Sequence, residues 1–173
     1  VELMARFDEE ANIEWATRLE QVGAHVVYGV VGYKVHAKAL LIVRREEGHL
    51  KRYAHLGTGN YHPRTARLYS DFGLMTANDE ITQDVNEVFK QLTGLGKART
   101  LEHVWMAPFT LQPNVVAAIA KEAEAAKAGK KAIVVAKMNS LLEPETIDAL
   151  YEASQAGVAI ELGQPIQHGY RHQ

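Results

Sequence analysis

Lys34, His36 and Lys38 alternate along a short apolar stretch, and their types and spacing point to phosphate chemistry. In a strand, alternate side chains point to the same face, so the imidazole would stand between two ammonium groups. Burying three such groups without partners is costly, which favours a face turned toward solvent or an anion. The ammonium groups would neutralise phosphoryl oxygens while the imidazole attacks phosphorus. A lone His-x-Lys pattern mostly arises by chance, so a second feature is needed.

The loop His55-Leu56-Gly57-Thr58-Gly59-Asn60 is that second feature. Glycines on both sides of Thr58 let the backbone approach a ligand closely and offer N–H groups to an anion. Asn60 adds a side chain that can donate or accept hydrogen bonds. If residues 34–44 and 50–58 pair as a hairpin, His36 lies near Thr58, and His55 lies near residue 39 or 40. The two features then converge on one site.

The composition is that of an ordinary folded protein: of 173 residues, 47% are apolar and 23% are charged, and there is no cysteine. These values exclude a disordered chain, a collagen-like repeat and a coiled coil. Without cysteine there is no disulfide, no thiolate zinc site and no cysteine nucleophile. The longest apolar runs, such as residues 39–43, are too short to cross a bilayer, and no signal peptide is expected. We expect a cytoplasmic protein, with membrane association as the alternative location.

Positive charge is concentrated in one part of a chain whose net charge is −2. Between Lys34 and Arg67 there are eight Lys or Arg residues, two acidic residues and four of the eight histidines. Such a stretch in a mildly acidic protein indicates an anion site. A plainer interpretation, that the side chains simply solvate the end of a hairpin, is equally good for four of these residues: Arg44, Arg45, Lys51 and Arg52.

Alternating strands and helices predict an α/β protein. The predicted helices cover 8–22, 79–92, 113–128 and 144–155, the last two opened by proline, and glycine follows the end of most of them. The predicted strands cover 1–6, 25–31, 34–44, 50–58, 68–76, 101–106, 131–138 and 158–162. The glycines at 94 and 96 mark a linker. We expect a first domain over 1–96, the start of a second, related domain over 97–163, and an atypical tail over 164–173, and hence a fragment of a larger protein.

Four ordered stretches of this sequence together resemble bacterial polyphosphate kinase. They are Ala5-Arg6-Phe7-Asp8-Glu9-Glu10-Ala11-Asn12-Ile13, Lys34-Val35-His36-Ala37-Lys38, Tyr53-Ala54-His55-Leu56-Gly57-Thr58-Gly59-Asn60 and Thr65-Ala66-Arg67-Leu68-Tyr69-Ser70-Asp71. The resemblance covers residues 1 to about 162. It implies a phospholipase D-like mixed sheet with flanking helices, followed by a truncated second domain of the same kind.

The resemblance also implies an activity and roles for single residues. The family transfers the terminal phosphate of ATP reversibly to polyphosphate, with Mg²⁺, through a phosphohistidine, which here would be His36. Lys38 and His55 would complete the catalytic set. Arg6 would belong to the phosphate and magnesium site, and Tyr69 and Asn60 to the phosphate or nucleotide site. Without the resemblance, Arg6 and Tyr69 would be read as structural residues.

The partners implied are ATP, ADP and inorganic polyphosphate, without DNA, and a homo-oligomer for the full-length family. Where the family carries a Val-Arg-Gly motif after the last strand, this sequence has Gly163-Gln164-Pro165, and the catalytic histidine of the second domain is missing. We therefore expect the chain alone to be inactive.

Two other functions compete with this interpretation. A phospholipase D-like nuclease or phosphodiesterase half-site would carry an aspartate at the position of Val43, so the valine argues against it. A non-catalytic α/β module would bind neither phosphate nor nucleotide.

Overall fold

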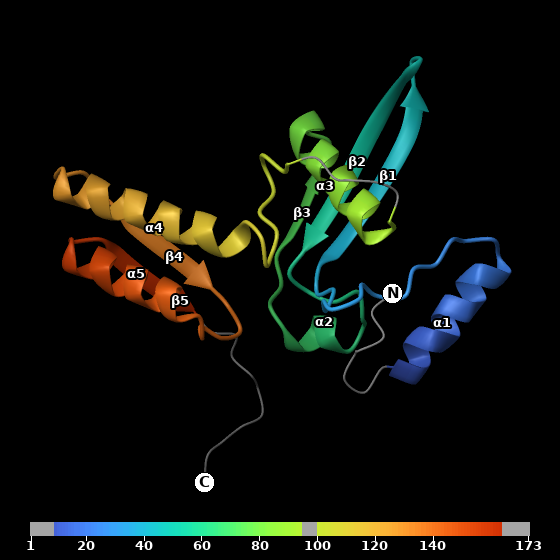
Figure 1. The fold of residues 1–173 in the computed structure, drawn as a ribbon, viewed down its shortest axis with the longest axis horizontal. Coiled ribbons are helices and arrows are strands. Elements are labelled where there is room, and N and C mark those ends of the chain that lie inside the picture. Colours follow the sequence, from blue (N-terminus) through green and yellow to red (C-terminus); the bar gives the residue numbers. More distant parts are fainter. Residues whose placement is uncertain (1–8, 95–99, 164–173) are drawn as a thin grey trace, which may run out of the picture. The chain divides into compact units, whose positions relative to one another are not determined.

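The computed structural model describes residues 9–94 and 100–163. They form two compact units, each of which is described by itself. The first comprises the chain as far as Tyr61 together with Asp71–Val104, and the second comprises His62–Ser70 and the chain from Trp105 onward. Helices and strands occur in both units, so the expected α/β class is confirmed at the level of a mixed α/β fold (Figure 1).

The first unit is built on an antiparallel sheet with strand order β1-β2-β3. Its strands are β1 (Lys38–Glu46), β2 (His49–Gly57) and β3 (Gly73–Thr76). Glu47 and Gly48 make the two-residue turn between β1 and β2, with φ of 49° and 82°. Positive φ at both positions is what the right-handed twist of a tight hairpin requires. The register places Leu40 opposite His55, as the sequence predicted.

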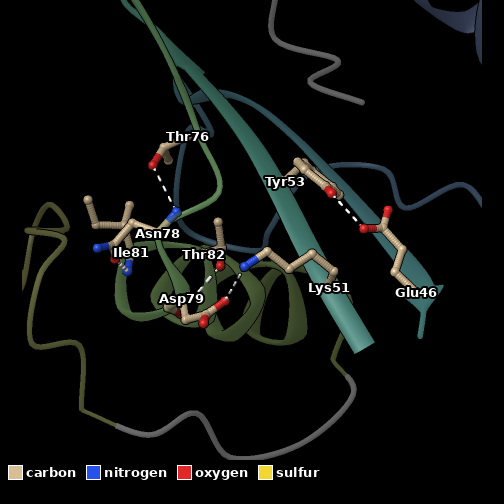
Figure 2. Close-up of polar contacts among 8 residues, drawn as sticks. All are labelled: Glu46, Lys51, Tyr53, Thr76, Asn78, Asp79, Ile81 and Thr82. Atoms are coloured by element: carbon tan, nitrogen blue, oxygen red, sulfur yellow. Dashed lines mark hydrogen bonds and ion pairs between the residues drawn. The ribbon is translucent and has the colours of Figure 1, made fainter. Parts of the chain in front are cut away.

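Helix α3 (Asp79–Leu92) packs against β1 and β2 (Figure 1). It begins as its sequence predicts, because the side chain of Asn78 accepts a hydrogen bond from the backbone N–H of Ile81 at 3.0 Å. Figure 2 shows this cap and a second link, in which the ammonium group of Lys51 on β2 lies 3.3 Å from the carboxylate of Asp79. Val85 of α3 is almost fully buried, so this helix supplies much of the core of the unit.

A buried carboxylate ties α3 to a segment far along the chain. Oδ2 of Asp84 accepts the backbone N–H groups of Glu102, His103 and Val104 at 2.9, 2.6 and 3.0 Å. In a strand, these N–H groups would donate to carbonyl oxygens of a neighbouring strand. Here they donate to a carboxylate instead. The predicted strand over 101–106 is therefore wrong.

Three further predictions about strands need correction. Residues 25–31 form no strand, because Gly29 and Gly32 take φ of 64° and 80° and turn the chain, leaving one isolated bridge between Val30 and Tyr33. Strand β1 begins at Lys38 and not at 34, since the β1–β2 ladder ends at the pair of Lys38 and Gly57. The predicted strand over 68–76 is reduced to β3.

The N-terminal helix α1 (Glu9–Gln21) belongs to the first unit, and the short helix α2 (Thr65–Leu68) belongs to the second. Helix α1 ends as predicted before Gly23, whose φ is 86°. The strand predicted over 1–6 lies outside the described residues.

The second unit contains a parallel pair of strands, β4 (Ile133–Lys137) and β5 (Ala159–Gly163). Helix α5 (Pro144–Gln155) connects them, and it packs with α4 (Leu111–Lys127). The buried core is apolar and small: Ile119, Ala123, Ala132, Leu150, Ala153 and Val158. None of the helices in the described part of the chain is long and apolar enough to cross a membrane.

Candidate functional site

His36 and Lys38 are in direct contact at the start of the sheet in the first unit. The ammonium nitrogen of Lys38 lies 2.9 Å from Nδ1 and 3.4 Å from Nε2 of His36, and it donates to the carbonyl oxygen of His36 at 2.6 Å. The predicted row of side chains on one strand face is wrong, because residues 34–37 precede β1. The lysine instead folds back over the imidazole. An ammonium group and an imidazole nevertheless lie together, on an exposed His36 and a half-buried Lys38.

The surroundings of His36 favour its neutral form. Burial lowers the pKa of His36, and the positive charges of Lys38 and Lys34 lower it further. Burial also lowers the pKa of Lys38, against the raising effect of the Asp71 carboxylate. Among the described residues, the side-chain partner of both ring nitrogens of His36 is the ammonium group of Lys38.

His55 lies on β2, where Nδ1 is 2.7 Å from the hydroxyl oxygen of Tyr61. The two ring centroids are 5.6 Å apart, with the planes tilted by 41°. Together with its strand neighbours, His55 borders a shallow hollow of about 290 Å³ that is lined by Leu40, Ile42, Tyr53, Ala54, Met75, Thr76 and Ala77. The ring is therefore held from one side by a hydroxyl and lies next to an apolar surface.

The glycine loop is held by the segment that precedes β3. The N–H of Thr58 donates to the carbonyl of Phe72 at 3.0 Å, and the hydroxyl of Thr58 accepts the N–H of Phe72 at 2.9 Å. The amide of Thr58 is thus used within the fold and is not offered to an anion. Gly59 packs so tightly against Asp71 that a methyl group on its Cα would overlap the carboxylate. Asn60 is exposed.

Two residues near this site were not singled out from the sequence, namely Tyr61 and Asp71. Both stand in the motif stretches or directly after one, which is the signal that could have found them. Two further predicted site residues lie outside the described part of the first unit. Tyr69 belongs to the second unit, where its N–H bonds to the carbonyl of Thr65 at the end of α2. Arg6 lies outside the described residues.

The described residues contain no group of three or more His, Cys, Asp or Glu side chains that could hold a metal ion. Magnesium is usually held by one or two carboxylates together with substrate phosphates and water. Asp71 is a carboxylate near Lys38, but by itself it does not make a protein site for the metal.

Residues 1–98 match the family model described as polyphosphate kinase C-terminal domain 1. This match alone covers more than half of the chain. The chain belongs to the polyphosphate kinase family. Residues 104–164 match a second model, polyphosphate kinase C-terminal domain 2.

Individual polyphosphate kinases are similar over almost the whole chain. Those of Burkholderia ambifaria and Paraburkholderia phytofirmans are each 66% identical over 166 residues, which is 94% of this chain and 24% of each relative. The crystal structure of polyphosphate kinase from Porphyromonas gingivalis matches with a TM-score of 0.80 and 40% identity, covering 95% of this chain and 27% of that one. The chain thus spans about a quarter of the length of the polyphosphate kinases that it matches.

Proposed function

We propose that this chain is the part of a polyphosphate kinase that carries the phosphorylated histidine, His36. In this proposal residues 1–96 are the later part of a first phospholipase D-like catalytic domain, residues 97–163 begin a second one, and 164–173 are an atypical tail. The observation that carries the proposal is the contact between His36 and Lys38 within a region matching polyphosphate kinase C-terminal domain 1.

The proposed reaction uses His36 as a nucleophile. An unprotonated ring nitrogen forms a bond to the terminal phosphorus of ATP while the bond from that phosphorus to the bridging oxygen breaks, and ADP leaves. A terminal oxygen of polyphosphate then attacks the same phosphorus, the N–P bond breaks, and His36 is restored. The lowered pKa of His36 supports this role because only the neutral imidazole has a free lone pair.

Lys38 has two tasks in this scheme. Before phosphate binds, its ammonium group lies against the imidazole and the backbone carbonyl of His36. When a phosphoryl group arrives, the ammonium group moves its hydrogen bonds to the phosphoryl oxygens, which frees a ring nitrogen and neutralises the developing negative charge. The positive charge that adds to the effect of burial in lowering the pKa of His36 is therefore also the charge that stabilises the transition state.

The rest of the proposal follows from the family. ATP and polyphosphate are the substrates, ATP enters with Mg²⁺, and Arg6, Tyr69 and Asn60 contact phosphate or nucleotide in the complete enzyme. That enzyme is a cytoplasmic or membrane-associated homo-oligomer that does not act on DNA. Because positioning and charge neutralisation account for most of phosphoryl transfer, the chain without the rest of its family's catalytic region is inactive.

The test uses a chimeric enzyme in which residues 1–163 of this sequence replace the matching segment of the Burkholderia ambifaria polyphosphate kinase. With ATP labelled in the terminal phosphate, the chimeric enzyme should form an acid-labile, base-stable phosphoprotein. His36→Gln should abolish the label, whereas His49→Gln, which changes an exposed histidine at the start of β2, should retain it. A phosphoprotein formed by His36→Gln at wild-type yield would make another residue the nucleophile, with His55 the first candidate.

A further inference from the structure

The ring of His55 occupies a niche that two glycines leave open. Gly57 and Gly73 are register partners on β2 and β3, and Gly57 follows His55 by two residues, so both glycines share its sheet face. A methyl group on Gly73 would lie 2.8 Å from Nε2 of His55, and one on Gly57 would lie 3.2 Å from Cε1. The imidazole therefore lies over Gly57 and Gly73, in space that a larger residue at either position would fill.

A polar contact of the ring comes from Tyr61, directly after the glycine loop. Its hydroxyl oxygen is 2.7 Å from Nδ1 of His55, a short distance for a hydrogen bond between neutral groups. A hydroxyl can donate or accept, and a neutral imidazole carries a proton on one of its two nitrogens. If one ring nitrogen accepts a hydrogen bond from the hydroxyl, the proton of the imidazole must be on the other ring nitrogen. The contact with Tyr61 is thus able to select the tautomer of His55.

We propose that Tyr61 is a positioning residue for His55: its hydroxyl donates to Nδ1 and holds the neutral ring with the proton on Nε2. Nε2 then presents an N–H toward the position that a side chain at Gly73 would occupy. The three atoms nearest to that position all belong to His55.

This arrangement gives the two histidines different tasks. His36 needs a free lone pair to attack phosphorus, whereas His55, held as the Nε2–H tautomer, donates a hydrogen bond to an oxygen of the transferred phosphoryl group. The catalytic meaning of the inference rests on the proposed function, but the hydrogen bond and the tautomer do not.

Ring-nitrogen NMR of the ¹⁵N-labelled 173-residue chain tests the tautomer directly. The wild-type chain should show His55 as the Nε2–H tautomer, and Tyr61→Phe should convert its signals to those of a tautomer mixture. Tyr151→Phe is the matched control, because Tyr151 is also an exposed tyrosine, 68% against 62% for Tyr61. An Nδ1–H tautomer in the wild type, or an unchanged spectrum in Tyr61→Phe, overturns the proposal.

The chimeric enzyme tests the catalytic use of this positioning. Losing one hydrogen bond to the ring should slow phosphoenzyme formation about 3- to 10-fold in Tyr61→Phe and leave Tyr151→Phe at the wild-type rate. Gly73→Ala should slow the reaction at least as much while Tyr61 is intact, because the added methyl group would lie 2.8 Å from Nε2 and displace the ring. A wild-type rate in Tyr61→Phe overturns the proposal. If the unmutated chimeric enzyme forms no phosphoprotein, the proposed function fails, and the spectrum still decides the role of Tyr61.

Discussion

The ammonium nitrogen of Lys38 lies 2.9 Å from Nδ1 of His36 and makes the imidazole harder to protonate. Burial is the larger cause of the lowered pKa of His36, and Lys38 and Lys34 follow in that order. Two like charges at this distance repel each other, so protonation of His36 carries an extra electrostatic cost. The pKa of His36 therefore depends on Lys38, two positions further along the chain.

Lys38→Met should therefore raise the pKa of His36, since it removes one of the two neighbouring positive charges. An NMR titration of the His36 ring protons measures the change. Lys51→Met is the control, because Lys51 pairs with Asp79 at the other end of the hairpin. A pKa of His36 that stays unchanged in Lys38→Met would contradict the electrostatic role of the lysine.

The same shift predicts how His36 affects stability as the pH changes. The pKa of His36 is lower in the folded chain than its ordinary value of about 6.5, so the unfolded chain takes up the proton first as the pH falls. The contribution of His36 to the free energy of unfolding is thus present above about pH 6.5 and is lost as the pH falls through the folded pKa. His36→Gln should flatten this part of the stability curve, measured by urea unfolding between about pH 7 and pH 5. An identical slope in both proteins would contradict the prediction.

Asp84→Ala should lower the free energy of unfolding by about 2–4 kcal/mol, because it leaves three part-buried N–H groups without the carboxylate that accepts them. Glu80→Ala is a control on the same helix. Glu80 pairs with His103 at 3.3 Å, but its side chain is 69% exposed, so its loss should cost less than about 1 kcal/mol. Equal losses of stability in urea unfolding would show that the Asp84 contacts add nothing.

Gly59→Ala should destabilise the loop by about 1–3 kcal/mol, because its methyl group would overlap the carboxylate of Asp71. If that overlap is the cause, Asp71→Gly in the same chain should remove most of the cost, and the two changes should be strongly non-additive in a double-mutant cycle. Additive losses of stability would place the effect elsewhere in the loop.

The 173-residue chain by itself should make little or no polyphosphate from ATP, since phosphoryl transfer depends on a complete set of charged contacts around the phosphate. Polyphosphate synthesis from labelled ATP measures this, with the chimeric enzyme as the positive control. Turnover by the chain at rates typical of kinases, about 1–100 per second, would contradict the prediction.

Local sequence determined the elements whose boundaries are set by neighbouring residues. Helices α3 and α5 have the predicted bounds, because Asn78 caps one and Pro144 opens the other. The β1–β2 hairpin has the predicted register at His55, since a two-residue turn allows one pairing of the flanking strands. The residue types of the site, an imidazole beside ammonium groups and a glycine loop, could also be read from the sequence.

Only the tertiary structure decided the contacts between residues far apart in the chain. Extended, apolar segments were predicted as strands over 25–31 and 101–106, but a strand also needs a neighbour to bond with, and that neighbour is not encoded locally. The amides of 102–104 bond to Asp84, about eighteen residues earlier, and Asp71 reaches Gly59 across the loop. The niche of His55 likewise depends on the pairing of Gly57 with Gly73. This pairing places a residue without a side chain on β3 next to the ring of His55 on β2.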